Sequence, residues 1–185
     1  MTVVTKEAAG PRSARDRLIL ALDFPAPAEA LALASRFRGR LAWVKVGMEL
    51  FTAAGPNLVS QLEDRGLKVF LDLKFHDIPN TVARAAAAAT ELGVAMFNVH
   101  ASGGQEMMAG AVEAARSRAS DLGITPPLVI AVTVLTSLDQ GTLNREVGLA
   151  GGVAGRQSEA LHVVRHAAGD QRRTLTPGEA LQAGS

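Results

Sequence analysis

The sequence predicts an α/β fold built on a parallel sheet. After residue 17, short apolar runs alternate with stretches of helical periodicity, and five apolar runs are present. These runs are nearly continuous, which is typical of parallel strands buried under helices. A strand and its helix recur roughly every 25 residues, a spacing that fits either a (β/α) barrel or an open doubly wound sheet. No G-x-G-x-x-G motif follows the first run, so a dinucleotide-binding sheet loses its main support.

Each element of this pattern has a local reason. The predicted strands are the five apolar runs, at residues 18–23, 41–47, 68–75, 94–101 and 126–136. The predicted helices follow the first four strands, at residues 27–37, 48–66, 79–93 and 103–123. The second helix is expected to break near Gly55 and Pro56, and the third to begin at Pro79, because proline is favoured in the first helical turn. Beyond residue 137, helical stretches and glycine turns continue without a strand of the earlier kind, and the run HVV (162–164) is too short to predict one.

Composition excludes several classes of protein. The chain has 185 residues, of which 48% are apolar and 20% charged, and its formal net charge is +1. We expect a disordered leader at residues 1–16 and one cytoplasmic domain at 17–185. The balanced charge argues against a nucleic-acid partner, and no apolar run reaches the roughly 20 residues of a membrane span. Because the sequence has no cysteine, it has no disulfides, thiolate nucleophiles or cysteine-bound metals.

Polar and charged side chains mark the ends of the predicted strands. In parallel sheets the active site lies at the carboxyl ends of the strands. The residues at these ends are Asp23, Lys45, Asp72, Lys74, Asn98, His100, Thr136 and Ser137. Ionisable groups inside otherwise apolar runs are unusual, so the sequence predicts an active site there.

The third predicted strand carries the densest group of charges. Asp72 and Lys74 are two residues apart, so their side chains are expected on the same face. Asp77 follows in the next loop, and Lys45 comes from the neighbouring strand. Burying one charge is costly unless it is paired, so these four residues are expected to form a network. A lysine among carboxylates stays protonated and can act as an acid.

Metal and anion sites have weaker support. His76 and His100 lack metal-ligand spacing, so no metal is predicted. The segment at residues 169–173 could hold a phosphate through its arginines.

Several motifs in this order resemble the orotidine 5′-phosphate decarboxylase family. The motifs are LALD (20–23), VKVGMELF (44–51), FLDLKFHDIPNT (70–81), NVHASGG (98–104), VTVLTS (132–137) and AGDQRR (168–173). The resemblance implies a TIM-type (β/α)₈ barrel that works as a homodimer without a metal or an organic cofactor. It also implies decarboxylation of orotidine 5′-phosphate to UMP, in pyrimidine biosynthesis.

The resemblance also implies a role for individual residues. Lys74 matches the family's proton donor to C6 of the pyrimidine, and Asp72 would lie beside the substrate carboxylate. Lys45 and Asp77 would complete the charged network. The remaining substrate contacts implied are Asp23 at the ribose hydroxyls, Ile78, Thr81, Thr136 at the pyrimidine and Gln171 near the 5′-phosphate. Asp77 and Thr81 would reach in from the other subunit.

The chain departs from the family pattern after about residue 152. The segment GVAGRQSEALHVVRH stands between residue 152 and the motif near residue 167, where the family has its sixth and seventh strands. The eighth strand and its G-R-P motif are also missing, and five strands cannot close a barrel. The chain is therefore interpreted as an altered or incomplete form of the enzyme, a weakened fragment that relies on dimerisation, or a non-functional remnant.

Two other functions remain open. The first is an inactive chain whose surface around residues 72–93 only pairs with another subunit. The second is a magnesium-dependent relative that acts on sugar phosphates, because such enzymes share the D-x-K-x-x-D pattern of Asp72, Lys74 and Asp77.

Overall fold

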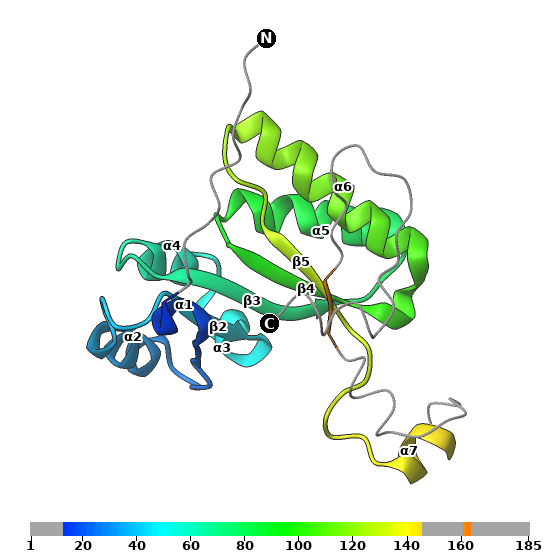
Figure 1. Cartoon of the computed structure of the whole chain (residues 1–185), viewed down its shortest axis with the longest axis horizontal. Helices are drawn as coiled ribbons and strands as arrows, with labels where there is room; N and C mark the ends of the chain where they lie inside the picture. Colours follow the sequence, from blue (N-terminus) through cyan, green and yellow to red (C-terminus); the bar gives the residue numbers. More distant parts are fainter. Residues whose placement is uncertain (1–12, 146–160, 164–185) are drawn as a thin grey trace. The chain divides into compact units, whose positions relative to one another are not determined.

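The computed structural model describes residues 13–145 and 161–163 (Figure 1). The sheet has the strand order β1-β2-β3-β4-β5-β6. Its strands are β1 (Ile19–Ala21), β2 (Trp43–Gly47), β3 (Lys68–Phe75), β4 (Met96–His100), β5 (Leu128–Val132) and β6 (Leu161–Val163). The helices are α1 (Ala14–Arg17), α2 (Pro27–Arg36), α3 (Met48–Ala54), α4 (Asn57–Glu63), α5 (Pro79–Glu91), the 3₁₀ helix η1 (Ala101–Gly103), α6 (Gly104–Leu122) and α7 (Gln140–Arg145).

The five predicted strands and the four predicted helical regions are confirmed, with shorter ends. The break near Gly55 and Pro56 separates α3 from α4, and Pro79 is the first residue of α5. Strand β5 ends at Val132, four residues before Thr136. Thr136 therefore lies in a turn closed by the Leu138 N–H, which donates to the Leu135 carbonyl, and not at a strand end.

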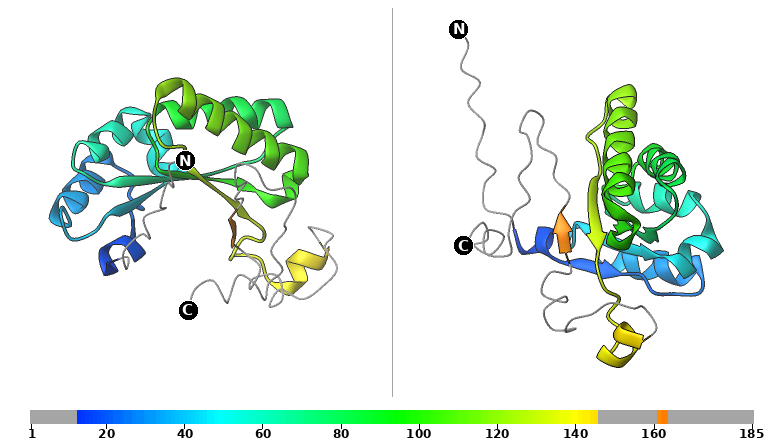
Figure 2. Two further views of the ribbon diagram at one scale, coloured as in Figure 1. Left: turned by 45° about the horizontal axis from the view of Figure 1, so that its top comes forward. Right: turned by 90° about the vertical axis from the view of Figure 1, so that its right-hand side faces the viewer.

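The described residues divide into two compact units, and the first contains the chain up to Asp72 together with Leu92–Ala95. Its strands are parallel, and α2, α3 and α4 lie on one face of them (Figure 2). Side chains on that face are buried: Val44, Val46, Val69 and Leu71.

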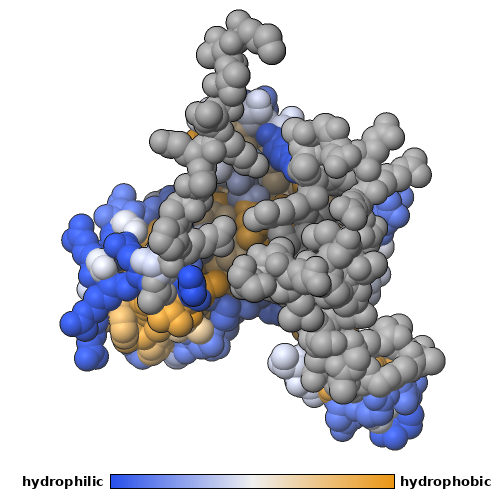
Figure 3. All heavy atoms as spheres, in the orientation of Figure 1, coloured by the Kyte–Doolittle hydropathy of each residue, from blue (hydrophilic) through white to orange (hydrophobic). Residues whose placement is uncertain are grey.

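The opposite face of the first unit carries its charged residues. Alternate residues of β2 and β3, among them Lys45 and Asp72, face this side and are partly exposed. Apolar residues also reach its surface (Figure 3), and Ile19 is 45% exposed. Helices α2, α3 and α4 thus bury one face of these strands, and the charged residues lie on the other face.

The second unit contains Leu73–Glu91 and the chain from Met96 onward. Strands β4 and β5 are parallel, and α5 and α6 lie on one face of them (Figure 2). Small side chains line the buried surfaces of both helices, including Ala86 on α5 and Ala111 and Ala115 on α6. Small residues at such a contact allow two helices to approach closely.

Strand β6 overlaps the run HVV, which is too short to predict a strand from the sequence. It pairs antiparallel with β5, with Val163 opposite Ile130, whereas neighbouring strands of a (β/α) barrel are parallel. Three residues are too few for periodicity to reveal a strand. Helix α7 precedes it in the chain, and its Thr142 N–H donates to Asp139 Oδ1 at 2.7 Å, as in a capped helix start.

The N-terminal region is described only from residue 13. Helix α1 lies at the end of the expected leader, and the rest of that leader lies outside the described residues. No helix in the described ranges is both long and apolar enough to cross a membrane.

Leu50→Ala is expected to lower the free energy of unfolding by about 2–5 kcal/mol, because it removes a fully buried side chain and leaves a cavity. Leu50 is 1% exposed, whereas Met48 on the same helix is 60% exposed. Met48→Ala should therefore cost about 0.5 kcal/mol or less. Urea unfolding followed by circular dichroism measures both changes. Equal losses in the two variants would contradict the described packing of α3.

Candidate active site

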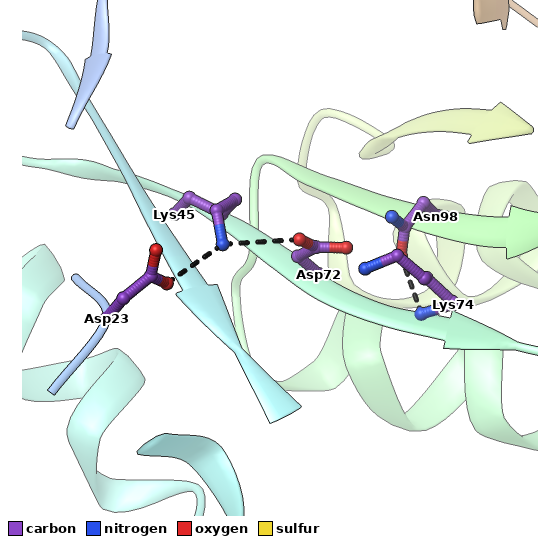
Figure 4. A network of polar contacts seen from close by, with 5 residues as sticks. All are labelled: Asp23, Lys45, Asp72, Lys74 and Asn98. Atoms are coloured by element: carbon purple, nitrogen blue, oxygen red, sulfur yellow. Dashed lines mark hydrogen bonds and ion pairs between the residues drawn. The ribbon is translucent and has the colours of Figure 1, made fainter. Parts of the chain in front are cut away.

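Lys45 forms ion pairs with two carboxylates of the first unit. Its Nζ atom lies 3.1 Å from Asp23 Oδ1 and 3.3 Å from Asp72 Oδ2 (Figure 4). The register explains this meeting, because Ala21 is paired with Lys45 and Gly47 with Asp72. The side chains of Lys45 and Asp72 are 24% and 13% exposed, and that of Asp23 is 70% exposed. The network therefore runs from a mostly buried carboxylate to one that faces solvent.

Two opposing effects act on the pKa of Lys45. Burial lowers it, but the hydrogen bond to Asp23 and the negative charges of Asp72 and Asp23 outweigh burial, so the pKa is raised above 10.5. A raised pKa means that the ammonium stabilises the folded chain at neutral pH, and that this contribution is lost only as the pH rises through the raised value.

Lys74 has an unusual backbone conformation. Its φ of 53° is the one positive value among the non-glycine residues that the structure describes. Such a conformation is uncommon for a residue with a Cβ and is found most often at functional sites. Regular alternation along β3 is interrupted there, so the expectation that Asp72 and Lys74 share a face no longer follows from their spacing.

Asn98 contacts Lys74 through the backbone. The Lys74 N–H donates to Asn98 Oδ1 at 2.7 Å (Figure 4), and Asn98 is 1% exposed. The sequence places Asn98 at a predicted strand end but indicates no role for it. The available signal was a single amide residue inside the apolar run of β4.

His76, two residues after Lys74, and His100, the last residue of β4, lie against each other. Their rings stack with centroids 5.0 Å apart, and Ser102 Oγ lies 2.5 Å from His100 Nδ1. Burial and, after it, the charges of His76 and Lys74 lower the pKa of His100 below 6.5. The lowered pKa favours the neutral form of the imidazole. In the described ranges, no three side chains of the types that bind metals come together.

The start of α5 presents the expected subunit-crossing residues on the surface. Asp77, Ile78 and Thr81 are all exposed, and Ile78 is 65% exposed. Asp77 Oδ1 accepts a hydrogen bond from the Ile78 N–H at 2.7 Å, and the Thr81 N–H donates to the Ile78 carbonyl at 3.0 Å. These contacts hold the loop before α5 in place.

The remaining predicted site residues are not part of these clusters. Thr136 is exposed in the turn after β5. Gln171, with the basic segment around it, lies outside the described residues.

The chain matches known proteins along most of its length. Residues 16–185 match the family described as "Orotidine 5'-phosphate decarboxylase / HUMPS family". A Syntrophotalea carbinolica protein named orotidine 5'-phosphate decarboxylase is 44% identical over 210 aligned positions, which span 93% of this chain and 85% of that protein. A Halorhodospira halophila protein of the same name is 59% identical over 135 residues, or 73% of this chain and 55% of that one.

Solved structures of other proteins have a fold similar to that of this chain. The fold is similar to that of an uncharacterized conserved protein from Geobacillus kaustophilus, with 41% identity and a TM-score of 0.71, over 76% of this chain and 65% of that one. It is also similar to orotidine 5'-phosphate decarboxylase from Lactobacillus acidophilus, with 36% identity and a TM-score of 0.70, over 78% of this chain and 64% of that one.

These matches also show a difference in length between this chain and its relatives. The chain spans slightly less than two thirds of the two solved chains. The 210 positions aligned with the Syntrophotalea protein exceed the 185 residues of the whole chain, so that protein has residues opposite gaps in this one. The described strands are accordingly those of an incomplete TIM-type barrel. Because the family pattern covers nearly the whole sequence and members of known structure share its fold, the chain belongs to the orotidine 5'-phosphate decarboxylase / HUMPS family.

Proposed function

We propose that this chain decarboxylates orotidine 5′-phosphate to UMP, a step of pyrimidine nucleotide biosynthesis, in the cytoplasm. Its family membership and the names of its relatives support this function. The observation that carries it is the Asp23–Lys45–Asp72 network, followed two residues later on β3 by the strained Lys74. The network provides fixed charges of both signs in the first unit, and in the proposed reaction the Lys74 cation, two residues further along the sequence, delivers a proton.

The proposed reaction requires stabilisation of a carbanion. The bond between C6 and the carboxylate breaks, CO₂ leaves, and the electron pair stays on C6. The Lys74 ammonium stabilises the developing charge and then donates a proton to C6, after which the neutral amine regains a proton from solvent. Fixed charges in a site that excludes water are the strongest means of such stabilisation, and the proposed reaction needs no cofactor.

The network around Lys45 has a supporting part in this proposal. The carboxylate of Asp72 would lie beside the substrate carboxylate, and the Lys45 ammonium, 3.3 Å from Asp72 Oδ2, keeps this carboxylate in place. Asp23, which is 70% exposed, would accept hydrogen bonds from the ribose hydroxyls. Ile78 and Thr136 would contact the substrate, and Gln171 would bind near its phosphate, whose remote binding energy holds the pyrimidine against the charges.

We further propose that the chain works as a homodimer in which Asp77 and Thr81 enter the partner's site. Both side chains are exposed at the start of α5, next to the exposed apolar Ile78. A closed two-fold dimer is the commonest assembly of soluble proteins.

Loss of orotidine 5′-phosphate, followed by its ultraviolet absorbance, tests the proposed activity. The purified chain is expected to turn over the substrate. Lys74→Ala should abolish turnover because it removes the proton donor, while its circular dichroism spectrum stays unchanged. Lys68→Ala removes a lysine from the same strand at an exposed position and should retain activity. A Lys74→Ala variant as active as the unmodified chain would exclude Lys74 as the donor.

The same assay distinguishes the other candidate functions. Turnover that is insensitive to EDTA is expected. Binding of UMP without turnover would identify an inactive chain, a possibility raised by its span of less than two thirds of the solved chains. Magnesium-dependent activity on sugar phosphates would instead place it with the other enzymes of the family.

Subunit mixing tests whether the sites are shared. Lys74→Ala and Asp77→Asn chains should each be inactive as homodimers. When they are mixed, each heterodimer would contain one intact site, so about one quarter of the unmodified activity should return. Activity that stays absent after mixing, in samples shown to exchange subunits, would place Asp77 in the same subunit's site.

The charge of Lys74 is expected to affect the pKa of His100. Because this charge contributes to the lowered pKa of His100, Lys74→Met should move that pKa upward toward 6.5. Proton NMR of the imidazole during a pH titration measures the change, and Lys68→Met is the matched control. An identical titration in all three proteins would contradict a cationic Lys74 close to His100.

A further inference from the structure

Asn98 is an unusual residue in the second unit because it is both polar and fully buried. In the described part of the chain only Thr90 and Asn98 are buried polar residues. The Thr90 hydroxyl is satisfied within its own helix, where it donates to the Ala86 carbonyl at 2.8 Å. Asn98 instead accepts a hydrogen bond from Lys74, 24 residues earlier in the chain. Its side chain thus joins two strands.

The position of this hydrogen bond coincides with the strained backbone. Lys74, with φ of 53°, is the residue whose N–H contacts Asn98 Oδ1. A left-handed conformation costs free energy in any residue with a Cβ and persists only where surrounding contacts hold it. A short bond from a buried acceptor, at 2.7 Å, is such a contact.

Neighbouring side chains hold the same two strands together. Phe75 and Phe97, the residues next to Lys74 and Asn98, have ring centroids 5.7 Å apart. The backbone of β4 is meanwhile paired with β5, with Asn98 opposite Ile130. Packing and pairing thus fix Asn98, and its carboxamide oxygen in turn offers a fixed acceptor to Lys74.

We propose that Asn98 is a positioning residue that holds the backbone of Lys74 in its left-handed conformation and thereby sets the direction of the Lys74 side chain. This inference rests on the proposed function for its catalytic consequence, but not for the contact itself. Asn98 need not touch the substrate in this role. It fixes the origin of the flexible lysine side chain, so that the ammonium is aimed at the reacting carbon before substrate binds.

Removal of the acceptor is predicted to loosen Lys74 without removing the lysine. Asn98→Leu keeps a similar volume in the core but leaves the Lys74 N–H without its oxygen. The amide hydrogen of Lys74 should then exchange with solvent about tenfold faster or more, since a typical hydrogen bond is lost. The kcat should fall by about 100-fold, because small misplacements of a catalytic group are costly, while KM changes little.

Two further variants separate positioning from general damage to the core. Asn98→Asp keeps an oxygen at the same place and should preserve slow exchange at Lys74, with a higher kcat than Asn98→Leu. Thr90→Val removes the other buried polar group in an equally conservative way. It should leave both the Lys74 amide and the split between kcat and KM unchanged, even if it lowers stability.

Hydrogen exchange measured by NMR decides the proposal even without turnover. In the unmodified chain, the Lys74 amide should exchange more slowly than that of the exposed His76, and this comparison remains available if a variant does not fold. Equal exchange at the two amides, or unchanged exchange at Lys74 in Asn98→Leu, would overturn the proposal. A chain that shows the expected exchange but no turnover would support the contact and refute the proposed activity instead.

Discussion

The pairing of the partly buried Lys45 ammonium with the carboxylates of Asp23 and Asp72 is the interaction on which the charged network depends. Burial alone would lower the pKa of Lys45, but Asp23 and Asp72 raise it. This pairing depends on the parallel register of β1, β2 and β3, which brings three residues from separate strands or strand ends to one place. The register in turn depends on the buried residues Val44, Val46, Val69 and Leu71. The charged network and the apolar core thus stabilise the same register of β1, β2 and β3.

Lys74 illustrates a different constraint, because its strain must be offset by contacts elsewhere. The left-handed backbone at Lys74 is accompanied by the Asn98 hydrogen bond and by the packing of Phe75 on Phe97. Such contacts add nothing to the chemistry directly. They reduce the number of positions that a long, flexible lysine can adopt, and preorganisation of this kind is a major part of enzymatic rate acceleration.

This chain differs from its solved relatives in how much of the family fold it spans. Its span of the solved relatives is 64–65%, and β6 is antiparallel to β5. In the proposed reaction, the described residues supply charge and the proton, whereas the expected phosphate contact at Gln171 lies outside them. The two tasks of the site are therefore separated along the sequence.

The sequence alone determined the β/α alternation, the break before α4, the start of α5 and the candidate charges Asp23, Lys45, Asp72 and Lys74. These features follow from local rules, since periodicity reports burial and proline reports a helix start. The tertiary structure decided which charges meet. Asp23 reaches Lys45 across 22 residues and Asn98 reaches Lys74 across 24, through strand register that no local pattern contains. The left-handed backbone of Lys74 and the antiparallel pairing of β6 likewise could not be predicted from the sequence, because both depend on partners distant along the chain.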